Sequence, residues 1–115
     1  MGGRAAIDSL AVLPFATTGS DPNTELLSDG LAEQLINSLS QLPQLRVIAR
    51  TTAFTYKGKP IDPAKLGKDL RVRTVLTGKV TERGDSLILQ VDLVGTENGS
   101  ELWGQQVYVS GQEHL

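Results

Sequence analysis

The feature that most constrains the fold is a helical stripe of leucines that is followed by a proline and then by a short apolar segment. Four leucines recur every four residues and therefore share one face of a helix: Leu27, Leu31, Leu35 and Leu39. We predict this helix over residues 24–42, capped by Thr24 and ended by Pro43, because proline lacks an N–H and disfavours helical geometry in the residue before it. Residues 46–50, RVIAR, then predict a strand with a buried centre.

An apolar run before this helix predicts a first strand. Residues 7–15, IDSLAVLPF, are nearly all apolar, which is typical of a strand covered on both faces. Strand, helix and strand together form a βαβ unit, so the two strands are expected to be parallel. Gly30 lies inside the helix, where glycine costs about 1 kcal/mol relative to alanine. We therefore expect a kink near Gly30.

The second half of the chain predicts a short helix and three strands. Asp62 and Pro63 suit the cap and first position of a helix that ends near Arg71. Strand-like patterns separated by Gly84-Asp85 and Asn98-Gly99 turns occupy residues 72–83, 86–93 and 101–109. The predicted fold is α/β: a single-domain two-layer sandwich in the order β-α-β-α-β-β-β, with a mixed sheet and both helices on one face.

The predicted domain spans residues 7–109. Residues 1–6 are interpreted as a linker or a cloning remnant, and residues 110–115 as a frayed tail or linker. The chain contains no cysteine, which excludes disulfides, zinc–thiolate sites and thiol catalysis. No stretch approaches the roughly 20 apolar residues of a membrane-spanning helix, so this domain is not expected to insert into a membrane.

Charge is unevenly distributed, although the net charge is only −2. Residues 46–83 carry ten Lys or Arg and three acids, for +7, whereas residues 1–45 carry −4 and residues 84–115 carry −5. The basic middle indicates either an anion-binding surface or solvated faces neutralised by acidic neighbours in the fold. An acidic chain with 4% aromatic residues is a poor candidate for nucleic-acid binding.

Catalytic and metal-binding patterns are absent from the sequence. Gly78-Lys79 lacks the glycine and hydroxyl residue of a phosphate-binding loop. The single histidine, His114, stands next to the end of the chain, which disfavours a histidine-based triad. Glu25, Asp29 and Glu33 are spaced to line one helical face, but acids in early turns more often complement the helix dipole than bind a cation. We predict no enzyme, no cofactor and no metal.

A polar patch after the second strand is the candidate binding site. It consists of Arg50, Thr51, Thr52, Lys57 and Lys59. The carboxyl end of a parallel strand is where open α/β sheets bind ligands, and these groups suit a carboxylate, a phosphate or an acidic peptide. The alternative is that the threonines cap a turn and the lysines are merely solvated. Trp103 is expected to be a core or edge anchor of the last strand.

Several segments together resemble a bacterial module related to the amino-terminal domain of TolB. They are AVLPF, DPNTELLSDGLAEQLINSLSQLPQLRVIARTTAFTYKGK, DPAKLGKDLRVRTVLTGKV, GDSLILQVDLV and ELWGQQ. The resemblance implies an α/β fold like that of TolB amino-terminal and FlgO-type domains, without catalytic activity. Such modules accompany kinase, nucleotide cyclase or winged-helix domains and tetratricopeptide repeats. The recurrent motif positions map to Pro14, Asp21, Ser28, Asp29, Gly30, Arg50, Lys57, Gly58 and Trp103, which are interpreted as structural.

The expected function is therefore a non-catalytic sensory or scaffolding module that relays binding or assembly to an effector in a larger signalling protein. Its expected partners are another protein or neighbouring domains, and homo-oligomers through the exposed edge of the last strands are a further hypothesis. The alternative is a receptor for a small anion or peptide in a cell-envelope protein. Localisation stays open, with a slight preference for an extracytoplasmic position.

Overall fold

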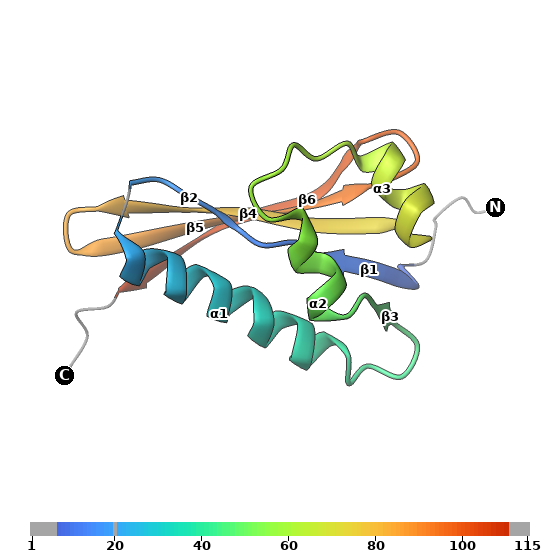
Figure 1. Cartoon of the computed structure of the whole chain (residues 1–115), viewed down its shortest axis with the longest axis horizontal. Helices are drawn as coiled ribbons and strands as arrows, with labels where there is room; N and C mark the ends of the chain where they lie inside the picture. Colours follow the sequence, from blue (N-terminus) through green and yellow to red (C-terminus); the bar gives the residue numbers. More distant parts are fainter. Residues whose placement is uncertain (1–6, 20, 111–115) are drawn as a thin grey trace.

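The computed structural model describes residues 7–19 and 21–110, which form one α/β domain (Figure 1). Its elements in chain order are β1 (Ser9–Val12), β2 (Ala16–Thr17), α1 (Pro22–Leu39), β3 (Arg46–Val47), α2 (Arg50–Ala53), the 3-10 helix η1 (Phe54–Tyr56), α3 (Pro63–Leu70), β4 (Thr74–Arg83), β5 (Ser86–Gly95) and β6 (Glu101–Ser110). The sheet order is β3-β1-β4-β5-β6, with β2 also paired to β4. The expectations for residues 1–6, for residues 111–115 of the predicted tail and for His114 lie outside the described residues, whereas Ser110 belongs to β6.

The sheet is mixed, as predicted. β1 is parallel to both β3 and β4, and α1 connects β1 to β3 as the crossover of the predicted βαβ unit. β4, β5 and β6 then form an antiparallel meander of three ten-residue strands. The α/β class, the single domain and the mixed sheet are confirmed.

Helix α1 begins and ends earlier than predicted. Its N-cap is Asp21, whose carboxylate accepts the N–H of Asn23 at 2.9 Å, and Pro22 occupies the first turn. The prediction of Thr24 as the cap was wrong, because the preceding Asp-Pro pair supplies both favoured residues. The helix ends at Leu39 rather than at residue 42, and it runs through Gly30 without a break.

The buried face of α1 is not the leucine stripe but the neighbouring row, in which three of the four residues are smaller than leucine. That row consists of Thr24, Ser28, Ala32 and Ile36. Small side chains let the helix approach the sheet closely, and the Ser28 hydroxyl donates to the carbonyl of Phe15 at 3.3 Å. The leucines occupy the positions next to this row and therefore lie at the edge of the buried face. Leu31 and Leu35 are half-buried, and Leu27 is 37% exposed.

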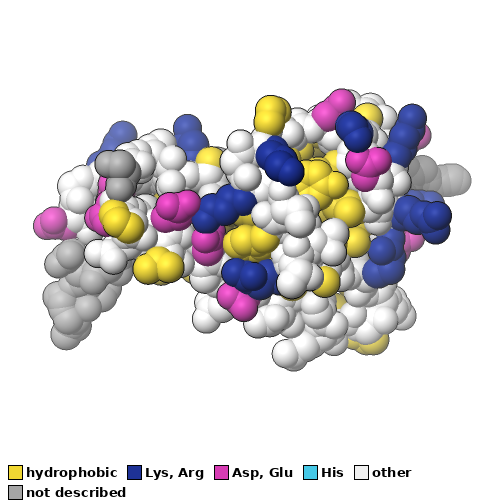
Figure 2. All heavy atoms as spheres, viewed as in Figure 1, with side chains coloured by type: hydrophobic (Ala, Val, Ile, Leu, Met, Phe, Trp, Pro, Cys, Tyr) yellow, Lys and Arg dark blue, Asp and Glu magenta, His cyan; other side chains and the backbone are white. Residues whose placement is uncertain are grey.

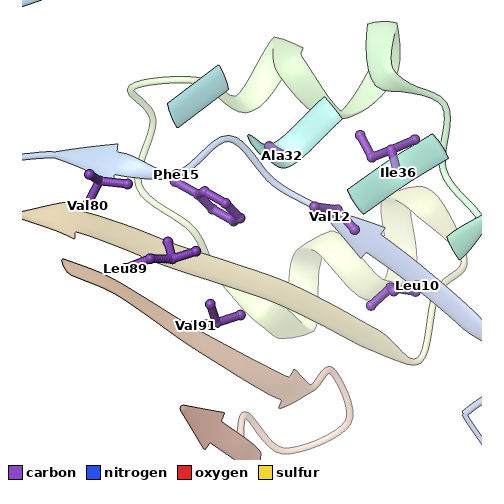
Figure 3. Close-up of a cluster of buried hydrophobic side chains, with 8 residues drawn as sticks. All are labelled: Leu10, Val12, Phe15, Ala32, Ile36, Val80, Leu89 and Val91. Atoms are coloured by element: carbon purple, nitrogen blue, oxygen red, sulfur yellow. The ribbon is translucent and has the colours of Figure 1, made fainter. Parts of the chain in front are cut away.

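Two hydrophobic clusters occupy opposite faces of β1. Leu10 and Val12 face the cluster beneath α1, which is completed by Phe15, Ala32, Ile36, Val80, Leu89 and Val91 (Figure 3). Ala11 and Leu13 face a second cluster with Leu66 of α3. The prediction that both helices lie on one face therefore needs correction, because α1 covers the first cluster and α3 the second. The cause is that β1 is buried at every position and carries apolar side chains on both faces, so each face requires cover.

Pro14 divides the predicted first strand into β1 and β2. Both pair in parallel with β4, but the register shifts by one residue between Val12↔Leu76 and Ala16↔Lys79. The extra residue turns Phe15 into the cluster under α1, whereas Leu13 points to the other face.

None of the described helices is both long and apolar enough to cross a membrane.

Candidate functional site

Three residues of the predicted binding patch, Arg50, Thr51 and Thr52, lie on the short helix α2, whereas Lys57 and Lys59 lie in the turn that follows η1. β3 ends at Val47, and α2 begins at Arg50, so the strand predicted over residues 46–50 is shorter than expected. The N–H of Ile48 still donates to the carbonyl of Leu10 at 3.0 Å. The chain then passes into α2, where Ala53 is fully buried.

Lys57 binds two carboxylates of α1. Its Nζ lies 2.5 Å from Asp29 Oδ2 and 3.0 Å from Glu25 Oε2. These hydrogen bonds raise the pKa of Lys57, the bond to Asp29 contributing most and that to Glu25 next. The Lys57 charge is thereby used inside the fold, to hold the segment after η1 against the start of α1.

Arg50 makes a second contact with the same helix. Its Nε lies 3.4 Å from Glu33 Oε1, and its guanidinium carbon lies 4.3 Å from the centre of the Phe54 ring. We call the ion pairs of Arg50 and Lys57 with Glu25, Asp29 and Glu33 the clasp. Figure 2 shows the basic and acidic side chains alternating near the middle of this face. The acidic row and the basic patch are thus two halves of one structural contact.

A pocket of about 610 Å³ lies at the carboxyl end of β1, beside the clasp. Its walls combine the segment from Leu13 to Thr17 with the segment from Tyr56 to Lys59. Lys57 and Lys59 are therefore brought to this pocket, whereas Arg50, Thr51 and Thr52 do not line it. The predicted five-residue site is divided between the pocket and the exposed side of α2, and its ligand-binding role stays a prediction.

The motif positions have identifiable places in the fold. Asp21 caps α1, Ser28 bonds the Phe15 carbonyl, and Gly58 has a φ of +77°, a conformation that favours glycine. Gly30 lies on the exposed side of α1, where no atom is within 4 Å of an added Cβ. Trp103 is 48% exposed on β6 and is not a core anchor.

Among residues 7–19 and 21–110, no group of three or more His, Cys, Asp or Glu side chains is arranged to hold a metal ion. The acids of the clasp are occupied by Lys57 and Arg50. Asp29 Oδ1 is buried and has no hydrogen-bond partner among the described atoms, so the Lys57 contact carries most of the compensation for burying this carboxylate.

Sequence reasoning did not identify the exposed apolar surface of β6. Four of its large side chains are 40–67% exposed: Leu102, Trp103, Val107 and Tyr108. A strand with one wet face has apolar residues at alternate positions, whereas these four occupy both parities. That departure from alternation is the sequence signal from which an exposed apolar surface on this strand could have been predicted.

Several solved structures share this fold. The lipoprotein GNA1162 from Neisseria meningitidis matches with a TM-score of 0.71 and 23% identity, over 90% of this chain and 80% of that chain. The LpoB C-terminal domain from Escherichia coli gives 0.66 and 17%, over 96% and 87%. A PelC dodecamer from Paraburkholderia phytofirmans gives 0.61 and 18%, over 96% and 78%. TolB from Acinetobacter baumannii gives 0.53 and 13%, over 94% and 24%. At these identities the likeness shows the fold alone.

Sequence comparison adds a curated relative and a family. The relative, "Putative adenylate cyclase 3" from Rhizobium meliloti (strain 1021), is 36% identical over 107 residues. The match covers 93% of this chain but only 18% of the relative. The model of the second domain of HilA/YgeH-like transcriptional regulators matches residues 5–115. The chain therefore belongs to the family of HilA/YgeH-like regulator second domains.

Proposed function

We propose that this chain is a non-catalytic interaction module of a larger bacterial signalling protein, in which it relays binding or assembly to an effector domain. The observation that carries the proposal is the pair of contexts in which such a domain occurs. One is the second domain of a transcriptional regulator family, and the other is 18% of a protein named as an adenylate cyclase. A domain common to two different outputs is better explained by a regulatory role than by either chemistry.

The side chains of the candidate site support the same role. Two of the three cations predicted to bind a ligand, Arg50 and Lys57, are engaged with carboxylates of α1. The exposed apolar side chains of β6 offer a surface of the kind that contacts other proteins. We further propose that the module is of the TolB- or FlgO-like kind and serves a kinase- or cyclase-type protein.

The test compares the natural protein that carries this chain with a version that lacks residues 7–110. The measured quantity is the output of the effector: cyclic nucleotide formation for a cyclase, or reporter transcription for a regulator. We expect the output, or its response to protein concentration, to change while the effector domain stays folded by circular dichroism. An unchanged output would contradict the regulatory role. Turnover of ATP or GTP by the isolated chain, abolished by one substitution within it, would contradict the non-catalytic role.

The alternative receptor function is tested by calorimetry with inorganic phosphate. Lys59 is the pocket-lining cation outside the clasp, so a phosphate receptor would require it. Saturable heat that is lost in Lys59→Ala and kept in Lys79→Ala, a substitution on β4 outside the pocket lining, would favour the receptor over the interaction module.

A further inference from the structure

The outer edge of β6 has the properties of a strand that pairs with another chain. β6 is ten residues long and is the last strand in the sheet order, so within the described chain it pairs only with β5. It contains no proline, lysine or arginine, the residues that commonly protect an exposed edge, and its one β-bulge, at Leu102, lies near its first residue. Its only Asp or Glu is Glu101, at the first position.

The exposed apolar residues of β6 are arranged symmetrically about Gln105. Trp103 and Val107 stand two residues on either side of it, and Leu102 and Tyr108 stand three residues on either side. Two identical strands placed antiparallel with Gln105 opposite Gln105 therefore bring Trp103 of each opposite Val107 of the other. By the same count Leu102 of each stands opposite Tyr108 of the other, but Leu102 is the extra residue of a β-bulge between the positions paired with Leu93 and Val94, so the regular pairing is centred on residues 103–107. A sequence with this spacing is complementary to itself.

We infer that the outer edge of β6 binds a second copy of this chain, by antiparallel pairing of the two β6 strands about a twofold axis at Gln105. This inference deepens the proposed function, because it names the surface and partner through which the module assembles. The pairing continues one sheet across both copies and satisfies the outward N–H and C=O groups of both edges. The same patch serves on both subunits, as a twofold interface requires.

The faces of the two sheets agree in this register. Trp103 is paired with Leu93 and Val107 with Leu89, and both β5 residues belong to or pack against the cluster under α1. Residues paired across strands point to the same face, so Trp103 and Val107 lie on the α1 face. Residues opposite each other in the proposed pairing differ by an even number of positions. The face that carries α1 in one copy is therefore continuous with the face that carries α1 in the other. The two Trp103–Val107 contacts would extend that cluster across the junction.

The charges of β6 are compatible with self-pairing. The backbone of Glu101 stands four residues from Gln105, but its carboxylate reaches back along the strand, where its Oε2 would lie 2.6 Å from a Cβ added at Gly104. In the proposed register Gly104 stands opposite Gln106 of the second copy, so each carboxylate faces a neutral residue. Asp92, which faces Gly104, is one strand further inside its own sheet. No like charges are placed directly opposite each other at the interface, an arrangement that destabilises strand pairs.

Two measurements test the dimer on the 115-residue chain. Sedimentation equilibrium should show a concentration-dependent dimer, and the emission of Trp103, the single tryptophan, should shift to shorter wavelength as the dimer forms. Val107→Lys should weaken the dimer about tenfold or more, because the twofold axis repeats each change. Leu26→Lys, which changes a 71% exposed leucine of α1, is the matched control and should leave the dissociation constant unchanged.

The register is tested with single cysteines, which this cysteine-free chain makes unambiguous. Gln105→Cys should form a disulfide-linked dimer on mild oxidation, because directly opposite Cα atoms are about 4.5–5.5 Å apart, within disulfide range. Gln106→Cys should react far more slowly, because its counterpart lies diagonally at about 7–8 Å. Faster linkage at position 106, no linkage at either position, or a monomer at all concentrations would overturn the inference. None of these outcomes bears on the proposed function, which is judged by effector output.

Discussion

Removal of the Lys57 charge should show how the clasp holds the chain after η1 against α1. In Lys57→Met the alkyl stem remains, but the ammonium that lies 2.5 Å from Asp29 and 3.0 Å from Glu25 is lost. The two partners differ in shielding, because the side chain of Asp29 is 23% exposed and that of Glu25 is 53% exposed. Solvent-exposed ion pairs contribute only about 0.2–1 kcal/mol, whereas hydrogen bonds to shielded charged groups reach about 1.5–3 kcal/mol.

From these values we expect a coupling free energy of about 1 kcal/mol between Lys57 and Asp29, after discounting for the partial exposure of Lys57. The coupling to Glu25 should be about 0.3 kcal/mol, the value typical of an exposed pair. The assay is a double-mutant cycle by urea unfolding, with Lys57→Met, Asp29→Asn and Glu25→Gln alone and in pairs. Lys59→Met is the control, because Lys59 is close in sequence and outside the clasp.

The raised pKa of Lys57 predicts how the Lys57–Asp29 coupling depends on pH. Because the folded-state pKa is raised above the ordinary value of 10.5, the contact stabilises the fold fully below that value and is lost as the pH rises through the raised pKa. The coupling should therefore persist at pH 7–9 and decline only at more alkaline pH. A Lys57–Asp29 coupling indistinguishable from zero, or smaller than the coupling to Glu25, would refute the structural reasoning.

Three further predictions concern other parts of the fold. Gly30→Ala should stabilise the chain by about 0.5–1 kcal/mol, because the added methyl enters open space on a helix. Gly78→Ala should destabilise it by about 1–3 kcal/mol, since its Cβ would lie 2.8 Å from the carbonyl oxygen of Gln90, and urea unfolding compares both variants with wild type. The hydrogen bond to Asp92 raises the pKa of Glu101, so stability falls as the pH rises through that pKa. Glu101→Gln should therefore raise the melting temperature at pH 7 but not below the ordinary pKa of 4.5, and equal melting temperatures at pH 7 would contradict the Glu101–Asp92 contact.

Local chemistry predicted the elements whose signals are local. Asp62 and Pro63 begin α3 as expected, because a cap and a fixed φ act within one turn. The same local signal is present at Asp21 and Pro22, which begin α1 in place of the predicted cap Thr24. Thr24 is instead buried, and its hydroxyl donates to Glu82 of β4 at 2.7 Å. A contact across 58 positions leaves no local signal.

The candidate site shows the same division. The acidic row of α1 and the basic patch after β3 were each visible in the sequence, and so was the excess of positive charge over residues 46–83. Their pairing depends on the packing of α2 and η1 beside α1, which periodicity does not specify. The ion pairs of Lys57 and Arg50 support the second interpretation of the basic segment, in which acidic neighbours in the fold neutralise its charge.

The two edge strands of the sheet, β3 and β6, differ in length and charge. β3 has the features of a protected edge, and β6 has those of an interface. β3 is two residues long, carries Arg46, and is held by a hydrogen bond from the Arg46 guanidinium to the carbonyl of Arg71. A short, charged edge gives another strand little to pair with. β6 is ten residues long and presents apolar side chains on both faces. Because the clasp binds charges of α1, α2 and the segment after η1 within the fold, the long apolar edge is the part of the described surface best suited to recognise a second chain.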